Sequence, residues 1–189
     1  MLAVLDNFLP ADAFSRLCQI TLPQRGGANV YGELQDQPFL AQLLREAARR
    51  FPLLRGYVAQ QALLRFEGRT GLLHHDLNHR PERRVSLLFY LEASDRGGEL
   101  VFPFFDVSGA PTRNPVTAAC SRLYAQETYY TAEPALEAYL VANRDALLTF
   151  RPIPNTLIVF PSQDPAFWHF VCPVEEGIRA CIVVFYNQP

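Results

Sequence analysis

Apolar residues recur at helical spacing in two segments near the start of the chain. In PADAFSRLCQI, residues 10–20, Phe14, Leu17 and Cys18 stand at positions i, i+3 and i+4. In FLAQLLREAARRF, residues 39–51, the same spacing is kept by Leu40, Leu43, Leu44, Ala47 and Phe51. Each segment is therefore predicted to be an amphipathic helix with one face for burial.

After about residue 60 the pattern changes to short apolar runs that are rich in β-branched and aromatic residues. Glycine, proline and aspartate separate these runs, which occupy residues 62–66, 84–91, 99–103, 156–160, 169–174 and 180–187. Short runs of this kind, bounded by turn residues, predict strands. Their number favours a sandwich or a jelly roll.

The segment from about residue 104 to 154 departs from this pattern. It is polar, contains prolines and the aromatic pair Tyr129 and Tyr130, and then shows helical spacing over residues 132–148. We interpret it as an inserted, lid-like segment near the open end of the sheets.

Composition limits the class of protein. A chain of 189 residues with 49% hydrophobic side chains can bury one good core, which predicts a single domain over residues 1–189. A net charge of −2 offers no broad basic surface, so nucleic acid is not expected as a partner. No signal peptide and no apolar run of transmembrane length is apparent, and we expect a cytoplasmic protein with no membrane partner. The cysteines, Cys18, Cys120, Cys172 and Cys181, lie far apart and are expected to be reduced core thiols.

The stretch GLLHHDLNHRPERR, residues 71–84, holds three of the four histidines, His74, His75 and His79. In an extended segment, His74 and Asp76 point to one face and His75 points to the other. Two such side chains fit a metal site, but a solvated loop carries the same pattern.

A third ligand is available at His169, which lies 93 residues after Asp76 at the start of another predicted strand. Two histidines and one carboxylate can occupy one face of an octahedral Fe(II) ion and leave three positions open. Arg179 follows His169 by ten residues and, by alternation, shares a face with apolar neighbours. A buried arginine there would pair with a carboxylate, whereas an arginine at the strand's rim would be solvated.

Together these stretches resemble the Fe(II)- and 2-oxoglutarate-dependent oxygenases, in particular the branch that includes the prolyl-4-hydroxylases. The similar motifs are, in order, HHD (74–76), RVSLLFYL (84–91), GGELVFP (97–103), NTLIVFPS (155–162) and HFVCPVEEGIR (169–179). The N-terminal VLDNFLPADAFSRL is also similar to the family's opening strand and helix. The resemblance implies a mainly β chain with flanking helices (α+β), built as a double-stranded β-helix (a cupin-like jelly roll) with the N-terminal helices on one sheet.

The resemblance also implies a role for each matching residue. His74, Asp76 and His169 would ligate Fe(II), and Arg179 would bind the distal carboxylate of 2-oxoglutarate. With O2, the family converts 2-oxoglutarate to succinate and CO2 and hydroxylates an unactivated C–H bond; ascorbate is a candidate reductant. Aspartate stands at position 76, where the related halogenases have a small residue, and this favours hydroxylation.

Several positions depart from the family pattern or allow a second interpretation. The family's tyrosine before the first histidine corresponds to Phe66, and Ser86 could contact 2-oxoglutarate in its place. We expect His75 to be structural, His79 to be solvated and Trp168 to pack in the core. Tyr129 and Tyr130 could line a lid or pin the insertion, and Arg80, Arg83 and Arg84 could attract an acidic substrate or form a solvated turn.

Two other classes of function remain open at this point. A non-enzymatic jelly-roll module that binds a ligand or a protein would tolerate loss of the metal ligands, which are intact here. A hydrolase with another metal would leave Arg179 unexplained, and no HExxH motif is present. For an oxygenase, the expected substrate is an amino acid side chain that is free, part of a peptide or protein, or carrier-bound.

Overall fold

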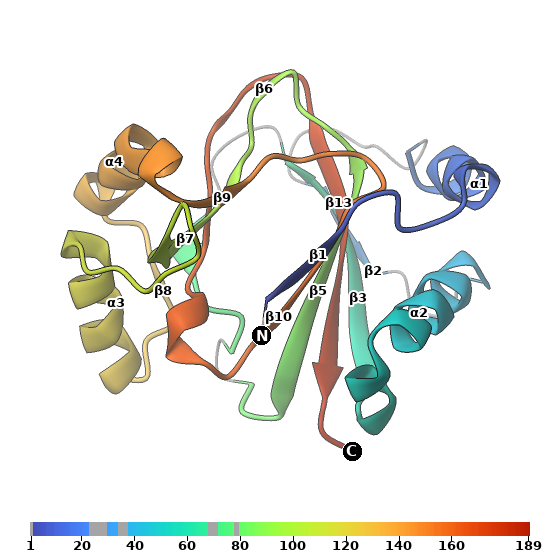
Figure 1. Ribbon diagram of the computed structural model, residues 1–189, viewed down its shortest axis with the longest axis horizontal. Helices are drawn as coiled ribbons and strands as arrows, with labels where there is room; N and C mark the ends of the chain where they lie inside the picture. The colour runs from blue at the N-terminus through green and yellow to red at the C-terminus, as the bar shows by residue number, and fades with distance from the viewer. Residues whose placement is uncertain (1, 23–29, 34–37, 68–71, 78–79) are drawn as a thin grey trace.

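The computed structural model describes residues 2–22, 30–33, 38–67, 72–77 and 80–189, with the side chains of 30–33, 38 and 60–67 left out of that description. Two antiparallel sheets face each other, with one pair of helices on each outer side (Figure 1). Among the described residues, no helix combines the length and the apolar character needed to cross a membrane.

The larger sheet has six strands in the order β1-β10-β5-β13-β3-β2. Their bounds are β1 Ala3–Leu5, β2 Val30–Glu33, β3 Val58–Glu67, β5 Arg83–Glu92, β10 Leu157–Pro161 and β13 Arg179–Asn187. All neighbours are antiparallel, and β13 pairs with β5 on one side and with β3 on the other. Because β13 lies inside the sheet, all of its residues are buried.

The smaller sheet has three strands in the order β11-β7-β9, with bounds β7 Leu100–Asp106, β9 Leu147–Phe150 and β11 Phe170–Val171. Two short pairs complete the strands: β4 Leu73–His74 with β8 Tyr130–Thr131, and β6 Arg96–Gly97 with β12 Val174–Glu176. An isolated backbone pairing between His74 and His169 places β4 beside the residue that precedes β11. The predicted mainly β fold with flanking helices is confirmed.

The helices are α1 Ala11–Thr21, α2 Pro38–Arg50, α3 Pro115–Ala125 and α4 Pro134–Asn143. Three short 3-10 turns lead into strands: η2 Pro52–Gly56, η3 Arg144–Ala146 and η4 Pro165–Phe167. Helices α1 and α2 pack on the outer face of the larger sheet, as predicted, where Leu17 and Leu43 meet Leu87 and Phe89. Alternation along β5 turns Leu88 to the other face, into the core between the sheets.

Helices α3 and α4 pack on the outer face of the smaller sheet (Figure 1). Their buried residues Cys120 and Leu140 meet Val101, Trp168 and neighbouring side chains. Both helices fall inside the segment 104–154, and so does β9, which pairs with β7 in the sheet itself. The other part of this segment, β8, borders β4. A lid-like role for the segment stays a prediction.

The sequence did not lead us to expect α3, although its start carries a clear signal. Asn114 accepts from the backbone N–H of Thr117 at 2.9 Å, and the Thr117 hydroxyl accepts from the backbone N–H of Asn114 at 3.0 Å. With Pro115 in the first turn, this reciprocal capping starts the helix. Only the end of the segment was expected to be helical.

Candidate metal centre

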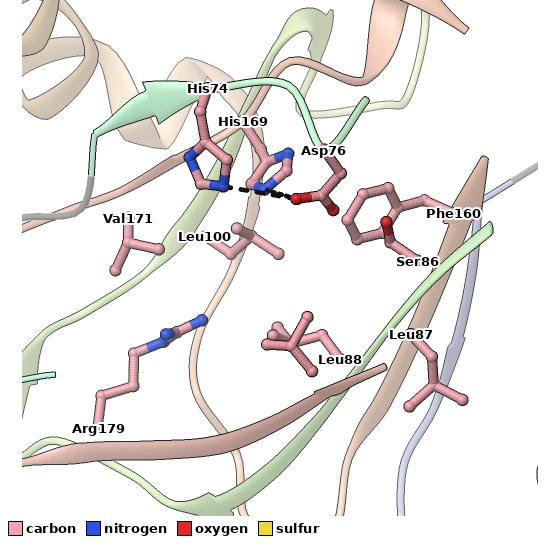
Figure 2. Close-up of a pocket in the computed structure, with 11 residues that line it drawn as sticks. His74, Asp76, Ser86, Leu87, Leu88, Leu100, Phe160, His169, Val171 and Arg179 are labelled. Atoms are coloured by element: carbon pink, nitrogen blue, oxygen red, sulfur yellow. Dashed lines mark ion pairs between the residues drawn. The ribbon is translucent and has the colours of Figure 1, made fainter. Parts of the chain in front are cut away.

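Three side chains that can ligate a metal converge between the two sheets. His74, Asp76 and His169 each offer one ligand atom, and these atoms all lie within 4.8 Å of one another. The Asp76 Oδ1 atom is 3.6 Å from His74 Nε2 and 3.8 Å from His169 Nε2 (Figure 2). Adjacent ligands about 2.1 Å from a metal lie about 3 Å apart, so a small inward movement would let the three donors hold one ion.

Backbone pairing brings the two histidines together from distant parts of the sequence. The N–H of His74 donates to the carbonyl of His169 at 2.9 Å, and the N–H of His169 donates to the carbonyl of His74 at 2.9 Å. Residues paired in this way place their side chains on the same face. Asp76 follows His74 by two residues and joins them after the strand turns.

Each histidine ring is oriented by a carbonyl two residues earlier in the chain. His74 Nδ1 lies 2.7 Å from the Leu72 carbonyl, and His169 Nδ1 lies 3.1 Å from the Phe167 carbonyl. Because a carbonyl only accepts, each Nδ1 carries the hydrogen and donates it. The Nε2 lone pairs are then free to face the centre, which is the tautomer that a metal requires.

The electrostatics of the cluster keep the ligands ready for a cation. Burial would raise the pKa of Asp76, but His169, His74 and the Ser86 hydroxyl together hold it well below its usual range. Burial, followed by repulsion from His74, lowers the pKa of His169 to about 3. At neutral pH the cluster therefore holds an anionic carboxylate and a neutral His169, which are the forms that bind a metal.

The backbone and side chain of Asp76 have further contacts. Arg83 donates to the Asp76 carbonyl at 2.7 Å, and its guanidinium lies 3.8 Å from the centre of the Phe185 ring. The Ser86 hydroxyl hydrogen-bonds to the Ser162 hydroxyl at 2.7 Å as well as to the Asp76 carboxylate. These contacts fix the carboxylate, and a contact of Ser86 with 2-oxoglutarate stays a prediction.

A pocket leads from the three ligands into the space between the sheets. Its lining residues are His74, Asp76, Ser86, Leu87, Leu88, Leu100, Phe160, His169, Val171, Arg179 and Val183. Figure 2 shows the Arg179 side chain extending from β13 toward the ligand end, with Leu100 between them and Leu88 to one side. The pocket thus has a ligand set at one end, a cation at the other and apolar walls in between.

The guanidinium of Arg179 is buried, with only 1% of the residue exposed, which excludes the solvated rim position. It donates to the Tyr90 hydroxyl at 3.3 Å and to Cys181 Sγ at 3.6 Å. Burial raises the pKa of Tyr90 well above its usual range, so this partner is neutral at physiological pH. A buried cation in an apolar pocket favours an anionic ligand.

The glycine pair of GGELVFP supports this arrangement. Gly97 and Gly98 have positive φ angles of 79° and 77°. A Cβ on Gly98 would lie 3.3 Å from Arg179 Cδ, and a Cβ on Gly97 would lie 2.0 Å from the Pro173 carbonyl oxygen. The turn between β6 and β7 therefore needs glycine both for its backbone and for its close approach to Arg179.

Two further residues border this pocket: Cys181, which we expected to be a core thiol, and Tyr90, which we did not single out from the sequence. Tyr90 and Cys181 contact Arg179. Tyr90 lies on the same face of its strand as Ser86, and alternation could have shown this. The side chain of Phe66, which stands at the position of the family's tyrosine, lies outside the described residues.

The other histidine and aromatic residues considered in the sequence differ in how far they are buried. His75 and Trp168 are fully buried on the side away from the ligands, as expected. Tyr129 packs beside His75, whereas Tyr130 is 53% exposed and pairs with His74 across β4 and β8. His79 lies outside the described residues.

Of the basic cluster, Arg80 is exposed and Arg83 contacts Asp76 as described above. Arg84 donates to the Pro81 carbonyl at 2.6 Å and to the Gln188 side chain at 3.1 Å. All four cysteines are free thiols, three of them buried.

Comparison with known proteins identifies the class of enzyme. The family model of the 2OG-Fe(II) oxygenase superfamily matches residues 62–187. The chain therefore belongs to this superfamily, and it is a 2-oxoglutarate-dependent dioxygenase that uses Fe(II), 2-oxoglutarate and O2. The double-stranded β-helix and the resemblance to the prolyl-4-hydroxylase branch are confirmed.

Several solved structures share the fold at low sequence identity. A viral collagen prolyl hydroxylase from Paramecium bursaria Chlorella virus-1, in complex with 2-oxoglutarate, is 14% identical, with a TM-score of 0.60 over 100% of this chain and 96% of that chain. A prolyl hydroxylase from Trichoplax adhaerens, in complex with a hypoxia-inducible factor peptide, is 16% identical, with a TM-score of 0.60 over 99% of this chain and 83% of that one. HygX from Streptomyces hygroscopicus, with iron bound, is 12% identical, with a TM-score of 0.60 over 99% and 82% of the two chains. No curated protein sequence matches.

Proposed function

We propose that the protein hydroxylates an unactivated C–H bond of an amino acid side chain, with release of succinate and CO2. In this proposal His74, Asp76 and His169 hold Fe(II), and Arg179 binds the distal carboxylate of 2-oxoglutarate. The observation that carries it is the pocket itself, in which three ligand atoms within 4.8 Å of one another face a buried guanidinium across apolar walls.

The protein's own residues account for binding and orientation. When bound, Fe(II) supplies the activation of O2 that couples oxidative decarboxylation of 2-oxoglutarate to hydroxylation of the substrate. The anionic Asp76 and the oriented histidines hold the cation, while Arg179 and the Tyr90 hydroxyl hold the carboxylate at the inner end. The apolar side chains Leu88 and Leu100 keep water out of the space between them.

The surroundings of His74 support a substrate with an apolar part. Tyr130 pairs with His74 and so lies on the same face, and it is 53% exposed. Leu72, two residues before His74, is 48% exposed. An aromatic and an aliphatic side chain beside the first iron ligand fit the aliphatic part of an amino acid, whether free, in a peptide or protein, or carrier-bound.

We further propose that residues 1–189 act as one oxygenase domain and that the segment 104–154 shapes access to the substrate site. Support comes from β8, which brings this segment next to β4 and its iron ligand. The two solved prolyl hydroxylases named above make prolyl residues natural members of the first substrate panel.

The test is an anaerobic titration of the metal-free protein with Fe(II) and then with 2-oxoglutarate. Bidentate chelation of the metal should produce a visible metal-to-ligand charge-transfer band. Replacement Arg179→Ala should weaken 2-oxoglutarate binding by about 30-fold or more, because truncating one partner of a buried charge pair costs about 2–5 kcal/mol. Arg84→Ala, at an exposed guanidinium outside the pocket lining, serves as the matched control and should bind 2-oxoglutarate normally.

A panel of free amino acids, prolyl peptides and carrier-bound amino acids would then be screened for substrate-dependent succinate. Fe(II) binding without the band, together with no succinate above background, would contradict the proposed role of this pocket.

A further inference from the structure

His75 lies between two metal ligands in the sequence, yet its ring faces away from the metal centre and is fully buried. Its Nε2 atom lies 2.9 Å from the Asp164 carbonyl, and its Nδ1 atom lies 3.2 Å from the backbone N–H of Leu77. A backbone N–H only donates and a carbonyl only accepts. Nδ1 therefore accepts, and Nε2 carries the hydrogen and donates it to Asp164.

These two hydrogen bonds join the segments that carry the ligands. Leu77 directly follows Asp76, and Asp164 starts the turn η4 that leads into His169. The backbone pairing of His74 with His169 already connects the same two segments at one point. The His75 ring adds a second connection on the opposite face, and two separated connections restrict rotation of one segment about the other.

Three aromatic side chains enclose the His75 ring, and two of them, Tyr124 and Tyr129, come from the segment 104–154. Its centre lies 5.4 Å from the ring of Tyr124, 6.2 Å from that of Tyr129 and 6.0 Å from that of Trp168. The backbone N–H of His75 donates to the Tyr129 carbonyl at 2.8 Å. Trp168 directly precedes His169 in the sequence, and His75 directly follows His74, so this aromatic group adjoins the backbone of both histidines.

A further hydrogen bond ties the same segment to the loop before His169. The Tyr124 hydroxyl donates to the Gln163 carbonyl at 3.1 Å, next to Asp164. Tyr124 therefore holds the loop next to Asp164, and the Tyr129 carbonyl holds the backbone of His75 itself.

We propose that His75 is a positioning residue that sets the spacing of the His74–Asp76 pair from His169, with Tyr124 and Tyr129 bracing its ring. The inference rests on the proposed function in so far as these three residues bind the metal. It gives the segment 104–154 a second role behind the metal centre, in addition to any role at the substrate side.

The test compares three replacements of His75 in the full chain. His75→Gln can place its amide N–H near the former Nε2 and keep the bond to Asp164, but it loses the acceptor for Leu77. His75→Asn can keep the acceptor near Nδ1 but is too short to reach Asp164. His75→Ala removes both.

Binding of Co(II), an air-stable substitute for Fe(II), is measured by titration, and unfolding of the metal-free protein is measured separately. We expect Co(II) affinity to fall about 10- to 100-fold in His75→Ala and His75→Asn, as for other residues that orient metal ligands, and to be largely restored in His75→Gln. Asp164→Asn is the matched control, because asparagine keeps both the helix cap and the backbone carbonyl.

The outcomes separate the two proposals. If all three His75 variants are less stable but bind Co(II) like the wild type at a temperature where they are folded, His75 is only structural and the inference is overturned. Equal losses in His75→Gln and His75→Asn would also overturn the role of the Asp164 connection. If the wild type itself does not bind Co(II), the metal assignment fails, and the inference fails with it.

Discussion

Each buried polar residue at the centre is satisfied by a particular partner. The carbonyls of Leu72 and Phe167 orient the rings of His74 and His169, and the Ser86 hydroxyl meets the Asp76 carboxylate. Because these contacts already hold the three side chains in place, less reorganisation is needed when a metal binds. Bringing three polar side chains together out of water costs free energy in return. Single replacements at this centre should therefore weaken metal binding without preventing the chain from folding.

Replacement Asp76→Ala should reduce Fe(II)-dependent turnover by at least 100-fold, because it removes the only anionic ligand of the three. The metal-free protein should also lose free energy of unfolding at neutral pH, because the lowered pKa of Asp76 means that the folded state stabilises its carboxylate. Succinate release and urea denaturation of the same preparation measure the two quantities. Full activity of Asp76→Ala in limiting iron would show that the ligand set is wrong.

The stability of the metal-free protein should depend on pH through the buried histidines. Burial lowers the pKa of His169 from 6.5 to about 3 and also lowers that of His75. The unfolded chain therefore binds protons below pH 6.5 that the folded chain does not, and stability falls as the pH falls. The slope is up to about 1.4 kcal/mol per pH unit for each histidine.

Urea denaturation between pH 6.5 and 5, above the usual range of carboxyl groups, measures this slope. In His169→Asn the slope should be smaller than in the wild type. An unchanged slope in that variant would show that His169 is not buried in its neutral form.

At the scale of elements, the segment 104–154 serves both the core and the metal centre. Helices α3 and α4 cover the smaller sheet, β9 extends that sheet, and β8 adjoins β4. A lid over the pocket would need a part of this segment that can move without exposing the core. Residues 128–131, at the start of β8, lie nearest to His74 and are the best placed for such a role.

Replacement Leu140→Ala should destabilise the protein by about 2–5 kcal/mol, because it leaves a cavity between α4 and the smaller sheet. Leu53→Ala, at a leucine that is 44% exposed, is the control and should change stability by no more than about 0.5 kcal/mol. Urea denaturation gives both values. Equal, small effects would indicate that α4 detaches readily from the sheet.

At the scale of the whole molecule, alternation and spacing predicted the two N-terminal helices, the main strands and either a sandwich or a jelly roll. The family resemblance then implied the double-stranded β-helix. The ordered motifs predicted the convergence of His74, Asp76 and His169, because strand order in the family fixes which segments meet. Local patterns could not predict β9 or the contact of Tyr90 with Arg179, whereas the capping signal at Asn114 could have predicted α3. The position of His75 also depends on Asp164, 89 residues away, which no local pattern encodes.

The central place of β13 has a consequence for how the protein is made. Among the described strands it is the last in sequence, yet it fills the middle of the larger sheet and carries Arg179. While the ribosome is still making the chain, β5 and β3 have no strand between them, and their edges need protection from pairing with other nascent chains. We expect iron to find no complete pocket until β13 has left the ribosome and inserted between β5 and β3.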